Sequence, residues 1–214
     1  MKKSALIALG CVGVLVVVAL VLIAFVAGSY NTLVRRSQAV DRQWAQVQNV
    51  YQRRADLIPN LVNTVSGAAN FEKSTLTEIT QARASVGQVK IDPTKAPDSA
   101  AELEKFQQAQ GALSSALSRL LVVSERYPEL RANSNFRDLQ AQLEGTENRI
   151  AVERGRFNEA VEAYNNVVRR FPTVFFAGMF GFKEKPYFTA KEGAETPPKV
   201  EFNFGTPSQT PTKP

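Results

Sequence analysis

The sequence predicts an all-α protein, with an N-terminal transmembrane helix followed by an up-and-down bundle of long antiparallel helices. Three observations lead to this prediction. Residues 5–27 form an uncharged apolar run of 23 residues. Beyond this run, apolar residues recur at steps of three and four over long segments, which is the period of one face of an α-helix. Residues that favour turns are rare within these segments and gather between them.

The apolar run is long enough to anchor the chain in a membrane. At roughly 1.5 Å per residue it spans ~35 Å, whereas a hydrocarbon core is about 30 Å thick. A cleaved signal peptide is the alternative, but its apolar core is usually only about 7–15 residues long. We therefore predict a short flank at residues 1–4 and a transmembrane helix over residues 5–27, in a single-pass protein of the cell (inner) membrane.

Basic residues lie on both sides of this anchor. Lys2 and Lys3 precede it, and Arg35, Arg36 and Arg42 follow it. The preference of basic residues for the cytoplasmic side therefore hardly separates the two orientations; we favour a soluble domain outside the cytoplasm. Arg35 and Arg36 are also candidates for contact with anionic lipid headgroups, at about 1 kcal/mol each when they lie near the surface.

The bundle is predicted over residues 30–171. A break with two prolines at residues 91–97 separates the first long segment from the second, and the third stops before Pro172. Candidate N-caps are Asp98 or Ser99 for the second segment and Asn133 or Ser134 for the third. The predicted core faces contain Leu33, Val40, Trp44, Val47, Tyr51, Ile58 and Leu61, then Leu103, Phe106, Leu113, Leu117 and Leu120, then Phe136, Leu143, Ile150, Phe157 and Tyr164.

Pro59 raises the main question about the architecture, because a proline inside a helix removes a hydrogen bond and kinks or breaks the helix. An unbroken rod over residues 30–90 would be ~90 Å long, far longer than the later helices. A first arm that is kinked or broken near Pro59 instead gives two arms that match the others and complete a four-helix bundle. We favour this form, in which Phe171 returns towards the membrane.

Polar residues around Pro59 make the first candidate site. Arg54 falls on the apolar face, where an unpaired guanidinium would cost several kcal/mol. Its candidate partners are Asp56, a carbonyl freed by the proline, or Glu153 of the third segment. Glu147 of the same segment lies off the apolar face and is not a candidate. The residues around the proline are Arg53, Arg54, Asp56, Pro59, Asn60 and Asn63. We interpret them chiefly as structural; a partner-binding site and a catalytic carboxylate are the alternatives.

The composition excludes much catalytic chemistry. The chain of 214 residues has no histidine, and its single cysteine, Cys11, lies in the apolar run. Imidazole catalysis, histidine-ligated metals, a di-iron site with Glu-x-x-His pairs and a disulfide framework are therefore excluded. We expect no enzymatic activity and no cofactor. A carboxylate-based, metal-dependent enzyme that uses Asp56 and Glu72 for a hard cation is the alternative.

An aromatic segment follows the bundle. Five phenylalanines lie within residues 171–182, which are too few residues to cross a bilayer. We predict an aromatic cap over residues 172–188; a membrane or subunit docking patch that uses Phe175, Phe176 and Phe180 is the alternative. From Lys183 onward the chain holds six of its eleven prolines, a composition that buries little apolar surface, and residues 189–214 are predicted to be disordered.

Several motifs resemble those of the LemA family. They are Tyr30-Asn31-Thr32-Leu33-Val34, Trp44-Ala45-Gln46-Val47, Gln52-Arg53-Arg54-Ala55-Asp56-Leu57-Ile58-Pro59-Asn60-Leu61-Val62, Thr80-Gln81-Ala82-Arg83-Ala84, Tyr164-Asn165-Asn166, Arg170-Phe171-Pro172 and Phe180-Gly181-Phe182. The resemblance implies a bacterial, membrane-anchored four-helix-bundle protein without an established activity, for which a TPM-domain membrane protein is a possible partner. At residues 67–72 the chain departs from the family, whose members often have a tyrosine and a histidine there.

The sequence therefore favours a non-enzymatic, membrane-anchored scaffold or assembly protein that self-associates or organises other membrane proteins. Its expected partners are the lipid bilayer and either further copies of itself or other membrane proteins. A ligand- or signal-sensing membrane adaptor is a further alternative. Nucleic acid is not an expected partner, because residues 30–182 hold 19 basic and 16 acidic residues that are interleaved.

Overall fold

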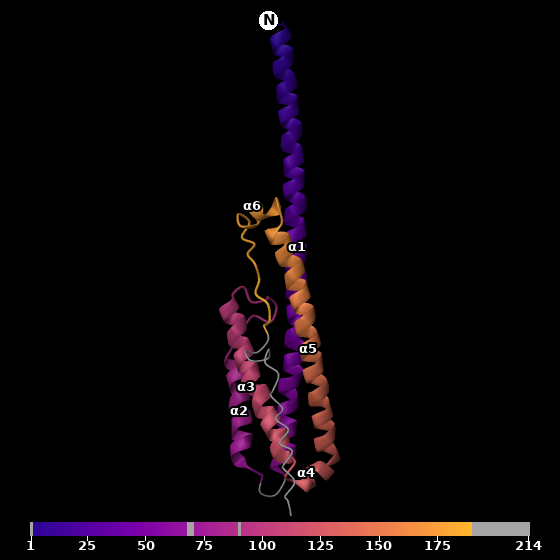
Figure 1. The fold of residues 1–214 in the computed structure, drawn as a ribbon, viewed down its shortest axis with the longest axis vertical. Helices are drawn as coiled ribbons and strands as arrows, with labels where there is room; N and C mark the ends of the chain where they lie inside the picture. Colours follow the sequence, from indigo (N-terminus) through magenta and orange to yellow (C-terminus); the bar gives the residue numbers. More distant parts are fainter. Residues whose placement is uncertain (1, 68–70, 90, 190–214) are drawn as a thin grey trace, which may run out of the picture.

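The computed structural model describes residues 2–67, 71–89 and 91–189, and this part of the chain is helical without any strand. The predicted all-α class is therefore confirmed. Figure 1 shows an elongated molecule in which one helix projects far beyond the others. The helices are α1 (Lys2–Ser66), α2 (Lys73–Gln88), α3 (Ala100–Ser124), α4 (Pro128–Ala132), α5 (Ser134–Arg169) and α6 (Thr173–Ala177).

Helix α1 joins the apolar run directly to the bundle (Figure 1). Among the described residues, it is the one helix long and apolar enough to cross a membrane: its most apolar window has a mean hydropathy of 2.9 and is not covered by any other part of the protein. A stretch of this kind is stable in lipid, where its backbone groups are satisfied within the helix. The structure is therefore compatible with the predicted single membrane anchor.

The predicted break at Pro59 is wrong, because α1 continues through the proline. The missing N–H would have bonded to the carbonyl of Ala55. That carbonyl instead accepts a hydrogen bond from Arg83 Nε of α2, at 3.4 Å. On the other side of the helix Ile58 and Leu61 stay buried. Burying such side chains contributes about 1.5–3 kcal/mol each, which together offsets the cost of about 3 kcal/mol for the proline.

The chain reverses after α1 rather than at the proline, and the following helices alternate in direction. Helix α5 packs along α1, while the shorter α2 packs against α3 at the end far from the anchor (Figure 1). Helices α1 and α5 continue towards the anchor beyond α2 and α3. Phe171 returns to the level of the apolar run, where it lines a small cavity together with Ala24 and Phe25 of α1. This return does not depend on the predicted break, because α1 is continuous.

Local capping explains where two of these helices begin. The hydroxyl of Ser99 accepts a hydrogen bond from the N–H of Glu102 at the start of α3. Asn133 Oδ1 accepts hydrogen bonds from the N–H groups of Asn135 and Phe136 at the start of α5. These bonds satisfy N–H groups that have no partner within the helix. In each case the structure selects one of the two predicted caps.

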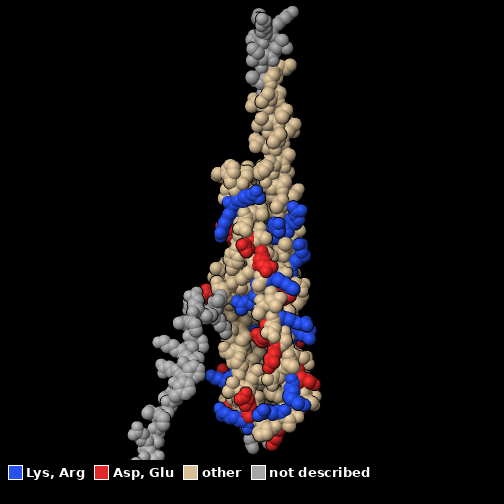
Figure 2. Space-filling view, turned by 45° about the vertical axis from the view of Figure 1, so that its right-hand side comes forward, with Lys and Arg blue, Asp and Glu red and all other residues tan. Residues whose placement is uncertain are grey.

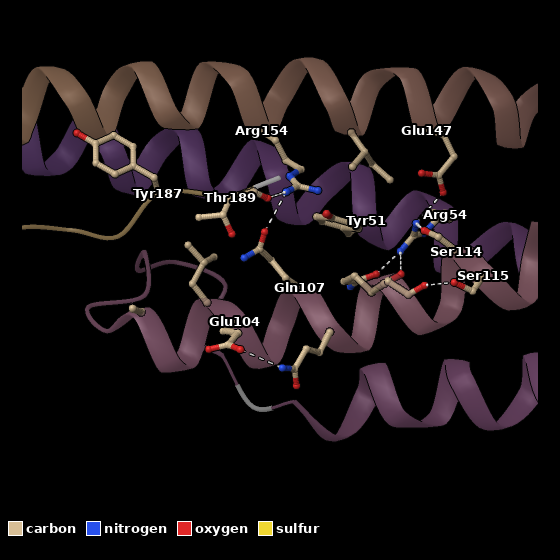
Figure 3. A pocket seen from close by; sticks show the side chains of 16 residues that line it. Tyr51, Arg54, Glu104, Gln107, Ser114, Ser115, Glu147, Arg154, Tyr187 and Thr189 are labelled. Carbon is tan, nitrogen blue, oxygen red and sulfur yellow. Dashed lines mark hydrogen bonds and ion pairs between the residues drawn. The ribbon is translucent and has the colours of Figure 1, made fainter. Parts of the chain in front are cut away.

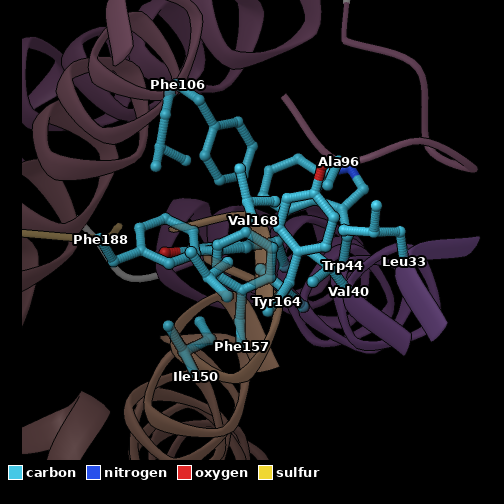
Figure 4. Packing of buried hydrophobic residues seen from close by; sticks show 14 of the residues in the cluster. Leu33, Val40, Trp44, Ala96, Phe106, Ile150, Phe157, Tyr164, Val168 and Phe188 are labelled. Carbon is cyan, nitrogen blue, oxygen red and sulfur yellow. The ribbon is translucent and has the colours of Figure 1, made fainter. Parts of the chain in front are cut away.

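The core consists of two apolar clusters, one near the membrane and one at the far end. The first is rich in aromatic residues: Trp44 lies against Phe106 and Phe157, with ring centroids 5.3 and 5.6 Å apart (Figure 4). The second is mainly aliphatic and includes Ile58, Leu61, Ile79, Leu113, Leu120, Phe136 and Leu143. The core-face residues named above are buried. On the same predicted faces, Leu76, Leu139, Ala160 and Val167 are only partly buried, and Phe171 at the end of the third face is exposed.

Residues 183–189, which we call the C-terminal strap, run in an extended conformation along the bundle. Asn165 bonds to both the N–H and the carbonyl of Lys185, at 2.9 Å each, and Asn158 does the same for Phe188, at 2.9 and 3.0 Å. Phe188 completes the aromatic cluster around Trp44 (Figure 4). The expectation of little buried surface from Lys183 onward is thus wrong for the strap; residues 190–214 lie outside the described part of the chain.

Candidate functional site

A polar layer centred on Arg54 lies between the two apolar clusters. The Arg54 side chain is only 1% exposed, and it connects three helices (Figure 3). Its Nη1 donates to Glu147 Oε1 of α5 at 2.6 Å and to Ser114 Oγ of α3 at 2.7 Å. Its Nη2 donates to the backbone carbonyl of Gln110 at 3.3 Å and to the side-chain oxygen of the same residue. Arg54 Nε has no partner among the described residues.

The partner of Arg54 differs from the predicted ones. Asp56 accepts a hydrogen bond from Gln52 on the outside of α1, and Glu153 is bound by Gln43 and Arg156. Glu147, which the periodicity placed off the apolar face, is 44% exposed and reaches inward only with its carboxylate. A position at the edge of the face suits this role, because one oxygen can pair with the guanidinium while the other remains hydrated.

The remaining residues of the Pro59 motif lie apart from Arg54. Arg53, Asp56, Asn60 and Asn63 are all directed away from the core, and their spacing of three and four residues places them in one stripe on the outside of α1. Pro59 is exposed beside them. The structure therefore divides the predicted group into a buried arginine that holds the bundle together and a polar stripe that faces outward.

A groove of about 550 Å³ opens beside the Arg54 layer, between α1, α3, α5 and the strap (Figure 3). Arg154 of α5 crosses it and donates hydrogen bonds to Gln107 Oε1 at 2.9 Å and to the carbonyl of Thr189 at 3.0 Å. The Arg154 guanidinium also lies over the ring of Phe188, 4.6 Å from its centroid. The full lining is Tyr51, Arg54, Ala100, Leu103, Glu104, Gln107, Gln108, Gln110, Gly111, Ser114, Ser115, Glu147, Ile150, Arg154, Tyr187 and Thr189.

The groove is polar but close to neutral, because it contains two arginines and two glutamates. Burial raises the pKa of the Tyr51 hydroxyl above its ordinary value, although the charges of Arg154 and Arg54 partly counteract this. Tyr51 is therefore a neutral hydroxyl at physiological pH. The lining offers hydrogen-bond donors and acceptors from arginine, glutamine, serine and tyrosine side chains, which suit the binding of a polar molecule rather than acid–base chemistry.

Sequence reasoning did not identify the ionic contacts of the strap. Lys185 is 6% exposed, and its Nζ lies 3.2 Å from Asp98 and 3.7 Å from Asp41. Burial raises the pKa of Asp98, but hydrogen bonds from Lys95 and Lys185 outweigh this effect and hold it below its usual range. The Tyr164 hydroxyl donates to the carbonyl of Lys183 at 2.8 Å. The strap is thus held by side-chain contacts along its whole length.

The second candidate site from the sequence, the aromatic segment, lies beside the anchor at the end of the bundle. Two contacts fix it to α1: the ring of Tyr30 packs against Phe180 and Phe182, with centroids 5.2 and 5.8 Å apart. Phe175 is 71% exposed and Phe180 40%, whereas Phe176 is half-buried. The segment therefore caps the bundle and also presents an apolar outer surface.

Basic residues surround this segment on the side towards the bundle. Arg35 and Arg36 are exposed on α1, where Arg35 lies close to the hydroxyl of Thr32, at 3.5 Å. Figure 2 shows Lys and Arg side chains gathered where the uncharged, tan part of the projecting helix meets the bundle. The structure brings Arg35 and Arg36 to the same end of the bundle as Phe175 and Phe180, as their joint assignment to a docking site requires.

Comparison with known proteins identifies the family. Magnetosome protein MamQ 2 of Paramagnetospirillum magneticum is 26% identical over 205 residues, which cover 86% of this chain and 74% of that protein. Magnetosome protein MamQ of Magnetospirillum gryphiswaldense is 24% identical, covering 78% and 67%. Protein LemA of Metamycoplasma hominis is 22% identical, covering 77% and 71%. The LemA family model matches residues 43–202, including the Arg54 layer, the polar stripe and the strap, and the chain belongs to the LemA family.

Proposed function

We propose that this chain is a non-enzymatic, membrane-anchored assembly protein that brings copies of itself, or other membrane proteins, together at a fixed distance from the bilayer. The continuity of α1 supports this most directly, because the helix that contains the apolar run also forms the longest edge of the bundle. From Gly28 to Ser66 it extends roughly 60 Å at the usual helical rise. Without a flexible linker, the surfaces of the bundle keep a defined height and direction.

The arrangement of the acidic residues also supports a non-enzymatic role. Among the described residues, no three Asp, Glu or Cys side chains are close enough together to hold a metal ion. Asp56 and Glu72, the candidates for a hard-cation site, have separate partners: Gln52 bonds to Asp56, and Arg126 lies 3.6 Å from Glu72. Hard cations need several oxygen ligands around one point.

The polar stripe on α1 is the surface that we assign to self-association. Arg53 and Asp56 lie one turn apart on it, and both are exposed. In a two-fold symmetric pair the same patch meets its own copy. Because both copies are anchored in the same bilayer through α1, the two stripes would meet in parallel. Each Arg53 would then lie one turn, or roughly 5 Å along the helix, from Asp56 of the other copy, within reach of an arginine side chain, while Asn60 and Asn63 supply neutral hydrogen bonds. The stripe is therefore complementary to itself in charge.

A charge-exchange experiment tests this assignment. Arg53→Asp places like charges opposite each other and should abolish the dimers seen by step photobleaching of labelled full-length chains in lipid bilayers. The double variant Arg53→Asp with Asp56→Arg restores opposite charges and should restore the dimers. Arg131→Asp, on the exposed surface of α4, is the matched control and should leave them unchanged. Dimers that persist in Arg53→Asp would refute the stripe as the contact, and monomers of the unaltered chain at all densities would refute self-association.

The family resemblance suggests a TPM-domain membrane protein as a different partner, and two relatives are named as magnetosome proteins. For this chain we propose a location in the inner membrane with the bundle outside the cytoplasm. A cysteine placed at Val122, which is 62% exposed, should then react with a membrane-impermeant maleimide in intact spheroplasts. If this cysteine reacts only after the membrane is opened, the bundle lies in the cytoplasm and the proposed orientation is wrong.

The groove favours a second candidate function, a ligand-sensing membrane adaptor. Arg54 pairs with Glu147, which leaves Arg154 as the groove's cation next to neutral donors such as Tyr51 and Gln107. These groups suit a small organic carboxylate, because guanidinium pairs with carboxylate through charge-assisted hydrogen bonds. Succinate serves as a probe: at about a hundred times its Kd it should stabilise the bundle by about 2.7 kcal/mol. Arg154→Met should remove that effect, and no shift in the unaltered chain would leave only the assembly role.

A further inference from the structure

The position of the aromatic segment along α1 indicates its depth relative to a bilayer. The segment, residues 171–182, is called the aromatic base below. Phe171 and Pro172 line a cavity of about 450 Å³ with Ala24, Phe25 and Gly28 of α1. The apolar run ends at residue 27. At 1.5 Å per residue, the start of the base therefore lies within roughly 5 Å of the end of the apolar run.

The surface of the base is apolar where it faces away from the bundle. Thr173 and Ala177 are buried against the bundle. The side chains that point outward include Phe171 at 75% exposure, with Phe175 and Met179 at 71% each. Apolar residues this exposed and this close together normally have a partner that covers them. These side chains lie level with the end of the apolar run of α1. The lipid that surrounds the run would therefore also cover them, which specifies lipid as the partner.

The charges around the base agree with this depth. Within residues 28–36 of α1 and residues 169–184 the basic residues are Arg35, Arg36, Arg169, Arg170 and Lys183, and the one acidic residue is Glu184, which is paired with Arg169. Arg35 lies eight residues beyond the apolar run, or about 12 Å. Basic side chains at that height reach the headgroups, whereas the base between them and the run is uncharged (Figure 2).

From these observations we propose that the aromatic base is seated in the bilayer, at the boundary between headgroups and acyl chains, as a second membrane contact beside the transmembrane helix. Phe171, Phe175 and Met179 enter the lipid, and the surrounding basic residues contact anionic headgroups. The bundle is then fixed to the membrane at two points, which restricts its tilt about the end of the apolar run. This inference is independent of self-association, because a monomeric chain would be seated in the same way.

The single tryptophan of the chain allows a direct test. Trp44 is fully buried in the bundle, so it provides a constant background when a second tryptophan is introduced. Phe175→Trp reports from the base. Val122→Trp, at 62% exposure on α3 near the far end of the bundle, is the matched control. Each full-length chain is placed in bilayers of phosphatidylcholine and phosphatidylglycerol, with phosphatidylcholine brominated near the headgroup end of its acyl chains as the quencher.

The proposal predicts that the added emission of Phe175→Trp, after subtraction of the Trp44 background, is blue-shifted and falls roughly twofold or more, because shallow bromines occupy the depth of about 5–10 Å that interfacial side chains reach. The added emission of Val122→Trp should stay unquenched. If the Phe175→Trp variant behaves like this control, the base faces water and the proposal is wrong. Blue-shifted emission without quenching means that protein covers the base, which also overturns it.

Met179→Trp provides an independent position in case Phe175→Trp loses its helical circular dichroism. Its original side chain is as exposed as that of Phe175, and the same quenching is expected. The measurement is made at one chain per nanodisc, so failure of the charge-exchange experiment on the polar stripe does not affect it. Conversely, unquenched emission at both positions would refute the seated base and leave the assembly role unaffected.

Discussion

Replacing Pro59 with alanine should stabilise the bundle, although proline lies in the most specific motif of the sequence. Proline in a helix interior costs about 3 kcal/mol relative to alanine. The substitution also increases the conformational entropy of the unfolded chain, which reduces the gain in stability by about 1 kcal/mol. A net stabilisation of about 2 kcal/mol follows, which for a chain of this size raises Tm by roughly 4–8 °C. Thermal unfolding of the full-length chain in detergent, followed by circular dichroism, measures the change.

The structure makes a sharper prediction about the coupling between Pro59 and Arg83. In the unaltered chain Arg83 Nε donates to the Ala55 carbonyl that the proline leaves unpaired. This bond is long and exposed, so Arg83→Met should cost only about 0.5–1 kcal/mol. In Pro59→Ala the new N–H bonds to that carbonyl, and Arg83→Met should then cost almost nothing. The double-mutant cycle should therefore show a coupling of about 0.5–1 kcal/mol.

A control and two refuting results complete this test. Arg119→Met removes an exposed pair with Glu78, at 2.8 Å, which does not involve the proline. Its effect should add to that of Pro59→Ala within the usual error of about 0.3–0.5 kcal/mol. If Pro59→Ala destabilises the bundle, the proline is needed for packing and its cost in the native helix is overestimated. If Arg83→Met has equal effects in both backgrounds, the Arg83 bond does not compensate for the proline.

Three further predictions concern the polar layer and the strap. Arg54→Lys should destabilise the bundle by about 2–3 kcal/mol in urea unfolding, because one ammonium cannot reach three residues, whereas Glu147→Gln, at a half-exposed position, should cost about 1 kcal/mol. Phe188→Ala should cost up to about 3 kcal/mol and release the strap, so trypsin should cleave after Lys183 faster than in the matched surface variant Tyr187→Ala. The folded-state pKa of Asp98 is lowered, so its stabilising contribution is fully present above its ordinary pKa of about 4 and is lost as the pH falls through the lowered value. The protection factor of the Phe188 amide, which compares its hydrogen exchange with the intrinsic rate at the same pH, should therefore fall at acid pH. Asp98→Asn should reduce this dependence without abolishing it, because the lowered pKa of Glu184 acts in the same direction.

The sequence predicted the features that depend on local spacing. The core faces of α3 and α5 were predicted because a 3.6-residue period places Leu103 and Phe106, or Phe157 and Tyr164, on one side of a helix whatever it packs against. The caps at Ser99 and Asn133 were predicted for the same reason, since a cap bonds to an N–H two or three residues away. The buried position of Arg54 also follows from spacing alone.

What the sequence could not show are contacts between distant residues. The partner of Arg54 is 93 residues away, and no local rule prefers Glu147 to Glu153. The continuity of α1 depends on Arg83 in another helix. The strap was missed because its own composition is unfavourable, and its stability comes from Asn158 and Asn165 of α5. These asparagines lie seven residues apart, beside Phe157 and Tyr164 on the apolar face, and this pattern was the available sign of an additional docked segment.

The polar layer also explains how the helices choose their register. The residues of α5 that face the core repeat with a period of seven. A shift of α5 by one heptad along the bundle would therefore replace Leu143 with Ile150 and preserve most apolar contacts. The same shift would move Glu147 by about 10 Å along the axis. Arg54 would then be buried without its carboxylate, at a cost of several kcal/mol. Apolar packing therefore specifies a bundle, whereas the bonds of Arg54 to Gln110, Ser114 and Glu147 specify one alignment of α1, α3 and α5.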